Sequence, residues 1–268
     1  MTCEVENSRL GVRPGDLGPE GTGPARSGPW WGRKARRGEE EGVANVGTIA
    51  ERSHLEYLSD MSSEFETAPA SEVIRWAVER FGRSIALACS FEDCVLVHLA
   101  VQVDPDVEVV FLDTGAHFPE TLEYVERVKK RYGLNLRVVR PGPEVAGWPC
   151  GTARCCELRK VAPLARALHG KSAWMTGLKR VDASTRRDAP IVSWDEARGM
   201  VKVNPIATWT DLDVEGYAAD HNLPTNPLVS RGYLSIGCAP TTRPVTPGED
   251  RRSGRFIGMG TTECGLHV

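Results

Sequence analysis

The sequence has no apolar run long enough to cross a lipid bilayer. The longest such run lies near residues 94–103, and His98 and Gln102 interrupt it, whereas a spanning helix needs about 20 apolar residues. The first ten residues also lack the basic patch and apolar core that are typical of a secretory signal. We therefore expect a cytoplasmic protein without a membrane partner.

The sequence also has little excess charge of either sign. The formal net charge is −3 over 268 residues, of which 41% are hydrophobic and 26% are charged. Such a chain has no overall field that would draw it to nucleic acid, and its composition is ordinary for a globular protein. The sequence therefore predicts no nucleic-acid partner, and it leaves open whether copies of the chain associate as a homo-oligomer.

Residues 1–45 have few side chains that a core could bury. Glycine and proline recur between Gly11 and Pro24, and the basic run at residues 33–37 is followed by three glutamates. Because there is little to bury, the entropy cost of ordering this segment goes unopposed. We predict a disordered N-terminal extension over residues 1–45.

Cysteine is not scarce, because the chain has eight cysteines and no secretion signal. The cytosol keeps thiols reduced, so metal ligands, catalytic thiols or core residues are expected in place of a disulfide framework. Cys89 and Cys94 lie in apolar stretches and are typical of core residues. Five others lie in segments rich in glycine, proline and cationic side chains, which can stabilise a thiolate. They are Cys150, Cys155, Cys156, Cys238 and Cys264.

Hydrophobic patterns predict strands and helices that alternate along the chain. Strands are expected at residues 84–90, 107–112, 136–139, 173–176 and 200–206. Helices are expected from residue 48 and over residues 71–82, 94–103, 120–132, 156–168 and 211–221. This alternation predicts an α/β fold, in which helices flank both faces of a parallel sheet. After residue 223, frequent proline and glycine end the regular pattern.

Small, polar and cationic residues follow three of the predicted strands. They are Ser90-Phe91 after the first strand, Asp113-Thr114 after the second, and Gly177 to Arg180 after the fourth. In parallel sheets, ligands bind at the carboxyl ends of strands, and helix N-termini favour phosphate or sulfate. Each loop alone is typical of an ordinary turn, but the three together predict a site for a nucleotide with anionic groups.

Cysteine spacing singles out two places. Cys155 and Cys156 are adjacent, and Cys238 follows a glycine in a loop. Adjacent cysteines bond to one another only through a strained ring. A vicinal pair therefore indicates metal or cluster ligation, or else two buried thiols at the start of a helix. The spacing alone does not decide between these two interpretations.

Cys264 lies three residues before His267, close to the end of the sequence. Chain ends are usually mobile unless something holds them. A thiol on such a tail is either an incidental cysteine or a nucleophile that can move into a pocket. The rest of the chain favours the second interpretation.

The motifs occur in an order that resembles the assimilatory sulfonucleotide reductases, and within them the adenylyl-sulfate reductase branch. The matching stretches include Ser90-Phe91-Glu92-Asp93, Leu112-Asp113-Thr114-Gly115, Cys155-Cys156-Glu157-Leu158-Arg159-Lys160, Thr176-Gly177-Leu178-Lys179-Arg180, Ser235-Ile236-Gly237-Cys238 and Glu263-Cys264-Gly265-Leu266-His267. The resemblance implies an adenine-nucleotide-alpha-hydrolase-like fold with a mobile C-terminal tail. It implies a sulfonucleotide-binding domain over residues 46–230, and a cluster loop and catalytic tail over residues 231–268.

The resemblance also implies a reaction and its partners. Cys264 attacks the sulfur of adenylyl sulfate and expels AMP, and reduced thioredoxin then releases sulfite from the S-sulfocysteine. A thiolate on a movable tail suits this chemistry, and cations beside the phosphosulfate offset the negative charge that would repel the thiolate. The implied substrate-binding residues are Ser90, Phe91, Asp113, Thr114, Lys160, Gly177, Arg180, Arg186, Arg252, Arg255 and His267.

By its vicinal cysteines, the chain resembles the members that carry a 4Fe–4S cluster. They hold it on a vicinal pair and a Cys-x-x-Cys, which implies Cys155, Cys156 and Cys238 as ligands here. The remaining position is Thr241, and a hydroxyl is a far poorer iron ligand than a thiolate. Three alternatives stay open: a cluster with one labile corner, a cluster completed by Cys150 or an external ligand, and no stable cluster. Cys150 is itself also typical of an ordinary loop thiol.

We therefore expect a thioredoxin-dependent adenylyl-sulfate reductase of assimilatory sulfate reduction. One alternative, which Thr241 favours, is a phosphoadenylyl-sulfate reductase without a stable cluster. Another is a non-catalytic homologue that binds the nucleotide or an iron–sulfur group. The retained motif around Cys264 argues against this last alternative.

Overall fold

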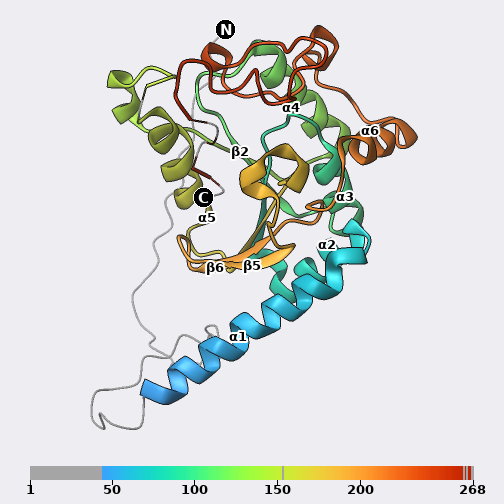
Figure 1. The fold of residues 1–268 in the computed structure, drawn as a ribbon, viewed down its shortest axis with the longest axis vertical. Helices are drawn as coiled ribbons and strands as arrows, with labels where there is room; N and C mark the ends of the chain where they lie inside the picture. The colour runs from blue at the N-terminus through green and yellow to red at the C-terminus, as the bar shows by residue number, and fades with distance from the viewer. Residues whose placement is uncertain (1–43, 153, 262, 264, 267–268) are drawn as a thin grey trace, which may run out of the picture. The chain divides into compact units, whose positions relative to one another are not determined.

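The computed structural model describes residues 44–152, 154–261, 263 and 265–266, with side chains from Ser53 onward. The disordered extension predicted for residues 1–45 therefore lies outside the described residues except at its last two positions. Helix α1, Ala44–Glu64, is the long blue helix in Figure 1. The sheet and the site described below belong to the compact unit that begins at Gly47.

Six strands form one sheet at the centre of this unit. In chain order they are β1 Ile85–Ala88, β2 Glu108–Leu112, β3 Leu136–Val139, β4 Ala173–Thr176, β5 Val192–Asp195 and β6 Met200–Val203. Their spatial order is β3-β2-β1-β4-β6-β5. Every neighbouring pair is parallel except β5 and β6, which run antiparallel. The predicted α/β fold is confirmed, with the correction that β5 adds an antiparallel edge strand.

The helices largely follow the hydrophobic pattern. After α1 they are α2 Ala70–Phe81, α3 Val95–Val103, α4 Pro119–Tyr132, α5 Ala162–Leu168 and α6 Asp211–Asp220. The helix predicted over residues 156–168 is divided, because a π-helical turn, Glu157–Val161, precedes α5. Pro163 is the second residue of α5 and directly follows the π-helical turn, and it has no N–H to donate to the preceding turn. Across the described part of the chain, every helix is too short or too polar to serve as a membrane span.

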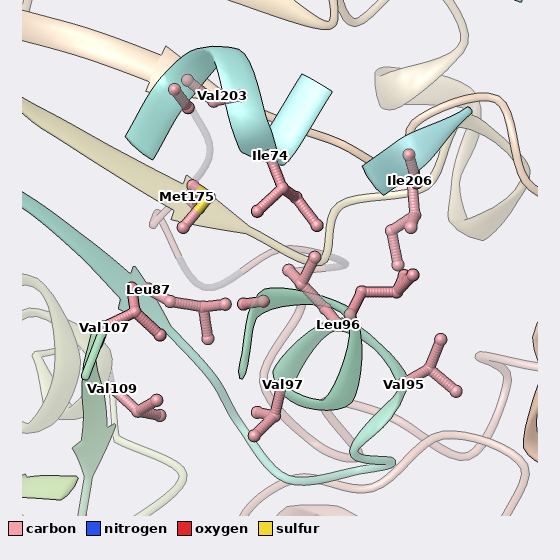
Figure 2. Packing of buried hydrophobic residues seen from close by; sticks show 14 of the residues in the cluster. Ile74, Leu87, Val95, Leu96, Val97, Val107, Val109, Met175, Val203 and Ile206 are labelled. Atoms are coloured by element: carbon pink, nitrogen blue, oxygen red, sulfur yellow. The ribbon is translucent and has the colours of Figure 1, made fainter. Parts of the chain in front are cut away.

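The larger hydrophobic core lies between the sheet and helices α2 and α3. Figure 2 shows its centre, where Ile74 of α2 and Leu96 of α3 lie beside Leu87 of β1 and Met175 of β4. Residues 95–101 of α3 are all buried. Strands β1, β2 and β4 carry nearly continuous apolar runs, which is typical of parallel strands covered on both faces.

A smaller core covers the other face of the sheet. Leu164 and Leu168 of α5 pack there with Ala86 of β1 and Trp174 of β4, and Figure 1 shows α3 and α5 on opposite sides of the sheet. Leu266, from the C-terminal tail, packs against this smaller core. The described end of the tail is therefore in contact with the body of the fold.

Strands β1 and β4 are neighbours at the point where the order of strands reverses. Strands β2 and β3 lie on one side of this point, and β6 and β5 lie on the other. The loops that leave Ala88 and Thr176 run to opposite sides, which opens a crevice at the carboxyl ends of the strands. The topology therefore places a ligand site at the loops that the sequence singled out.

Candidate active site

A cavity of about 210 Å³ lies at the carboxyl ends of β1 and β4. Eight of the residues predicted to bind substrate or metal line it. They are Ser90, Thr114, Lys160, Gly177, Arg186, Cys238, Arg252 and Arg255. The structure thus gathers at one place residues that lie far apart in the sequence.

Two residues predicted to bind substrate turn away from the cavity into the fold. Phe91 is fully buried and packs edge-to-face on Phe111 with ring centroids 5.5 Å apart. The carboxylate of Asp113 accepts hydrogen bonds from the Gly115 amide at 3.0 Å and from Arg140 Nε at 2.9 Å. Phe91 therefore supports the core, and Asp113 shapes the turn after β2.

Arg180 is the third predicted binding residue that does not line the cavity. Its guanidinium donates two hydrogen bonds to the Glu66 carboxylate, at 2.8 and 2.6 Å, and a third to the Ala189 carbonyl oxygen at 2.8 Å. Each of the three guanidinium nitrogens thus donates one hydrogen bond. Arg180 therefore ties its loop to the segment that follows α1.

Three guanidinium groups line the cavity. Burial, together with the positive charges of Arg186 and Arg255, lowers the pKa of Arg252. Burial is the largest cause of this shift, and the two neighbouring guanidinium groups add to it. An anion bound beside Arg252 would relieve this repulsion, so the site is suited to phosphate or sulfate groups.

The Gly237 backbone permits Arg255 to lie across its loop. A Cβ at Gly237 would lie only 2.6 Å from Nη2 of Arg255. Nη1 of Arg255 donates to Ser235 Oγ at 2.9 Å and to the Ile236 carbonyl oxygen at 3.1 Å. The loop at residues 235–237 therefore binds the Arg255 guanidinium group and leaves room for it at Gly237.

Glu92 connects the loop after β1 to the loop at residues 235–237. One carboxylate oxygen accepts hydrogen bonds from Ser235 Oγ at 3.1 Å and the Ile236 amide at 2.9 Å, and the other pairs with Arg251 at 3.1 Å. Sequence analysis placed Glu92 in a motif but gave it no role. Its position directly after a predicted buried strand was the available signal.

Lys179 is a second cavity residue that sequence analysis left without a role. It is only 6% exposed, and its ammonium group pairs with Asp182 at 3.3 Å and with Asp211. Two carboxylates therefore pair with this buried ammonium group. Its place beside Gly177 and Leu178 in the loop after β4 was the signal that could have identified it.

The C-terminal tail docks at the cavity through Glu263. Its carboxylate accepts hydrogen bonds from Arg186 at 2.9 and 2.7 Å and from Arg252 at 3.5 Å, and Leu266 lines the cavity. Cys264 and His267, the predicted nucleophile and its neighbour, lie outside the described residues. The described residues on both sides of Cys264 therefore contact the predicted site.

The predicted metal ligands lie beside the cavity and are joined by a further cysteine. The Sγ atoms of Cys155 and Cys156 are 4.0 Å apart, and the thiols of Cys150 and Cys238 are near enough to shift each other's pKa. Their interaction raises the pKa of Cys150 and lowers the pKa of Cys238. These thiols therefore form one group, whose members come from two distant parts of the chain.

Cys238 is held against the loop after β2. Its Sγ lies 3.5 Å from Thr114 Oγ1, its backbone forms an antiparallel bridge with His117, and the Ala239 amide donates to the Ala116 carbonyl oxygen at 2.7 Å. These contacts fix the thiol at the cavity wall. A group bound by this cysteine would lie next to the substrate site.

A single metal ion and a four-iron cluster make different demands on their donors. Over residues 53–152 and the later described segments, no three His, Cys, Asp or Glu side chains are arranged to hold one metal ion. A 4Fe–4S cluster makes a different demand, because each cysteine binds a separate iron. Neighbouring thiols that approach from different segments meet that demand.

The fold and the cavity together define a class of protein. A mainly parallel sheet, covered on both faces, with a cavity and buried cations at its switch point, defines an α/β protein that binds a nucleotide with anionic groups. Residues 84–244 match the family model described as the phosphoadenosine phosphosulfate reductase domain. The chain belongs to this family, and the predicted resemblance is confirmed.

Curated relatives cover most of the chain. The adenosine 5′-phosphosulfate reductase of Mycolicibacterium smegmatis is 45% identical over 235 residues, which cover 84% of this chain and 100% of the relative. The protein of the same name from Streptomyces coelicolor is 44% identical over 238 residues, which cover 85% of this chain and 98% of the relative. The likeness therefore extends well beyond the matched domain.

Solved structures support the same fold. The phosphoadenylyl-sulfate reductase from Candida auris, in a phosphate complex, has a TM-score of 0.61 and 26% identity and covers 70% of this chain and 97% of its own. The FMN adenylyltransferase of Candida glabrata, in complex with FAD and pyrophosphate, has a TM-score of 0.51 and 14% identity, with coverage of 76% and 81%. At that identity the likeness concerns the fold alone.

Proposed function

We propose that this protein reduces adenylyl sulfate to sulfite and AMP. The observation that carries the proposal is the docked tail, since Glu263 binds two cavity arginines and Leu266 lines the cavity on the other side of Cys264. Curated relatives that are 44–47% identical bear the name of this reductase. Together these findings support an oxidoreductase that acts on a sulfur group.

The cavity suggests how the substrate binds. We place the adenosine beside Ser90 and Gly177, at the ends of β1 and β4, where the backbone leaves room for a ligand. The phosphosulfate then lies among Arg252, Arg255 and Lys160, whose positive charges can hold its oxygens by charge-assisted hydrogen bonds.

The first chemical step is transfer of the sulfonyl group to the tail thiolate. The Cys264 sulfur attacks the sulfate sulfur, a sulfur–sulfur bond forms, and the bond from sulfur to the phosphate oxygen breaks. The electron pair leaves on AMP, and the enzyme carries an S-sulfocysteine. Arg252 and Arg255 offset the negative charge that would repel the thiolate and stabilise the charge that moves onto AMP.

The second step needs a reductant with two thiols, and we propose reduced thioredoxin. One of its thiolates attacks Cys264 Sγ, which forms a mixed disulfide and releases sulfite. The second thiol of the donor then resolves this disulfide and restores the Cys264 thiolate, so that two electrons pass from the donor to the sulfur group. This cycle belongs in a reducing compartment such as the cytoplasm.

We also propose that the chain holds a 4Fe–4S cluster with Cys155, Cys156 and Cys238 among its ligands. When bound, the cluster would tie the π-helical turn to the Cys238 loop and place its charge beside the substrate site. Lys160, whose positive charge acts on the Cys238 thiol, also lines the cavity. The proposed sulfur transfer itself is carried out by the tail thiolate.

A sulfite assay tests the proposed function. Anaerobically purified protein receives adenylyl sulfate and reduced thioredoxin, and we expect sulfite from the natural chain, none from Cys264→Ser, and wild-type rates from Cys94→Ser, a buried cysteine outside the cavity. Absence of sulfite from the natural chain would contradict the activity. Faster turnover of the 3′-phosphorylated nucleotide would favour the phosphoadenylyl-sulfate reductase instead.

A further inference from the structure

Thr241 stands where the resemblance implies the last cluster cysteine, and its hydroxyl is turned toward its own backbone. Thr241 ends the short 3₁₀ turn Ala239–Thr241 and is 7% exposed, and its Oγ1 donates to the Cys238 carbonyl oxygen at 3.4 Å. A hydroxyl engaged in this way is a poor ligand for iron. A complete set of four thiolates therefore requires a sulfur from elsewhere in the chain.

Cys150 reaches the same place from a distant segment. Its thiol lies near enough to the thiols of Cys238 and Cys155 to interact with both. The next residue, Gly151, lies close to the threonine, since a Cβ built there would lie 3.4 Å from Cγ2 of Thr241. The segment that carries Cys150 therefore lies beside Thr241.

Hydrogen bonds hold this segment in place from two sides. Arg159 donates to the Trp148 carbonyl oxygen at 3.1 Å and to the Thr114 carbonyl oxygen at 2.7 Å, which links the segment to the loop after β2. On its other side, the Gly151 amide donates to Cys155 Sγ at 3.3 Å. The approach of this segment to the vicinal pair is thus built into the fold.

We propose that Cys150 supplies the fourth thiolate and holds a 4Fe–4S cluster together with Cys155, Cys156 and Cys238. This inference rests on the cluster included in the proposed function and assigns its last ligand to a residue outside the Cys-x-x-Cys pattern. Thr241 removes one thiolate from the expected ligand set, and Cys150 adds one. The set therefore still has four thiolates, the ordinary number for such a cluster. Ligation exchanges the thiol–thiol contacts for iron–sulfur bonds and releases the thiol protons.

The proposal is tested by measuring iron and acid-labile sulfide in anaerobically purified protein. We expect about four of each per natural chain, a several-fold loss in Cys150→Ser, and recovery in the double variant Cys150→Ser/Thr241→Cys, where the fourth thiolate returns by the other route. Thr241→Cys alone should leave the iron content unchanged. The matched control is Cys94→Ser, whose thiol contacts the Pro224 carbonyl oxygen instead and should keep the natural iron content.

Electron paramagnetic resonance after brief oxidation gives a second readout that does not depend on activity. An iron corner without a cysteine is the first to be lost, so Cys150→Ser should show a three-iron cluster, whereas the natural chain and the double variant should not. A three-iron signal of equal size in the natural chain and in Cys150→Ser would overturn the assignment of Cys150.

Three other results would also overturn the assignment. The first is equal iron in Cys150→Ser and the natural chain, and the second is a gain of iron in Thr241→Cys alone. The third is a disulfide between Cys150 and Cys238 in iron-free protein prepared without oxygen, because the pair would then serve redox chemistry.

Sulfite assays on the same samples distinguish failure of the ligand assignment from failure of the proposed activity. Iron-free protein that forms sulfite contradicts the cluster and its ligand assignment but not the reductase activity, and a full cluster without sulfite contradicts only the activity.

Discussion

Arg180 and Arg186 belong to the same cationic stretch of sequence, yet their side chains have different surroundings. Arg186 lines the cavity and pairs with Glu263, whereas Arg180 pairs with Glu66. The hydrogen bond from Arg180 to Glu66 lowers the pKa of that carboxyl group. The direction of each side chain depends on which carboxylate the fold brings near, and no sequence pattern contains that information.

Replacing Arg180 should therefore affect stability and leave substrate affinity unchanged. Arg180→Gln removes the bidentate ion pair with Glu66, in which the arginine and glutamate side chains are 25% and 40% exposed. Solvent screening limits the loss to about 1 kcal/mol of unfolding free energy, which urea denaturation would measure. The affinity for adenylyl sulfate, measured by calorimetry in a Cys264→Ser background, should not change. A weakening of tenfold or more would restore Arg180 to the binding site.

The Glu263 carboxylate gives the docking of the tail a defined pH dependence. Burial raises its pKa. Hydrogen bonding to Arg186 and the charges of Arg186 and Arg252 together lower the pKa by more than burial raises it, so the pKa lies below its ordinary value of 4.5. The stabilisation is therefore complete above this ordinary value and is lost as the pH falls through the lowered one. We expect docking to be constant from neutral pH to about pH 5 and to weaken only in stronger acid.

An NMR titration of the Glu263 carboxyl carbon measures this pKa, and Glu263→Gln identifies its resonance. The same variant should slow formation of S-sulfocysteine on the order of tenfold, because it removes a partly buried, charge-assisted contact. Titration at or above the ordinary value would mean that the carboxylate is not paired with the arginines.

Loops and short elements shape the site as much as single side chains do. The loop at residues 235–237 receives Arg255, and the Gly237 position tolerates no Cβ without moving that guanidinium. Since the group that would move is the end of a flexible side chain, the fold can adjust around it. We therefore expect a side chain at residue 237 to affect substrate binding more than the stability of the fold.

Gly237→Ala should weaken substrate binding while the protein stays folded. Displacing Arg255 removes a charge-assisted hydrogen bond worth about 1.5–3 kcal/mol, so calorimetry in a Cys264→Ser background should show at least a tenfold weaker affinity for adenylyl sulfate. Gly216→Ala in α6, where a Cβ meets nothing within 4 Å, is the matched control. It should raise stability by about 0.5–1 kcal/mol without changing affinity. Unchanged affinity in Gly237→Ala would remove Arg255 from the substrate site.

At the level of elements, the sequence predicted most of the fold, because β1, β2 and β4 carry buried apolar runs. Strand β5, Val192–Asp195, was missed because it is a short edge strand with a single buried residue, Val192. The π-helical turn, Glu157–Val161, was read as ordinary helix, since its residues have normal helical preferences. Both differences arise where tertiary contacts outweigh the local pattern.

The molecule as a whole brings together three parts of the chain that the sequence keeps apart. The switch point between β1 and β4 supplies the cavity, the segment after residue 231 supplies cations and Cys238, and the tail closes on them through Glu263. The order of the motifs in the sequence predicted that these three parts of the chain lie together. It could not show that Cys150 lies beside Cys238, because a contact between distant loops depends on the whole fold.

Mass spectrometry of the intact protein tests the central claim most directly. Natural protein mixed with adenylyl sulfate in the absence of any reductant should gain the mass of one sulfonate group, and peptide mapping should place that group on Cys264. Reduced thioredoxin should remove the added mass, and Cys264→Ser should not acquire it. A natural chain that remains unmodified while AMP and sulfite accumulate with thioredoxin, or a sulfonate on another cysteine, would contradict the account.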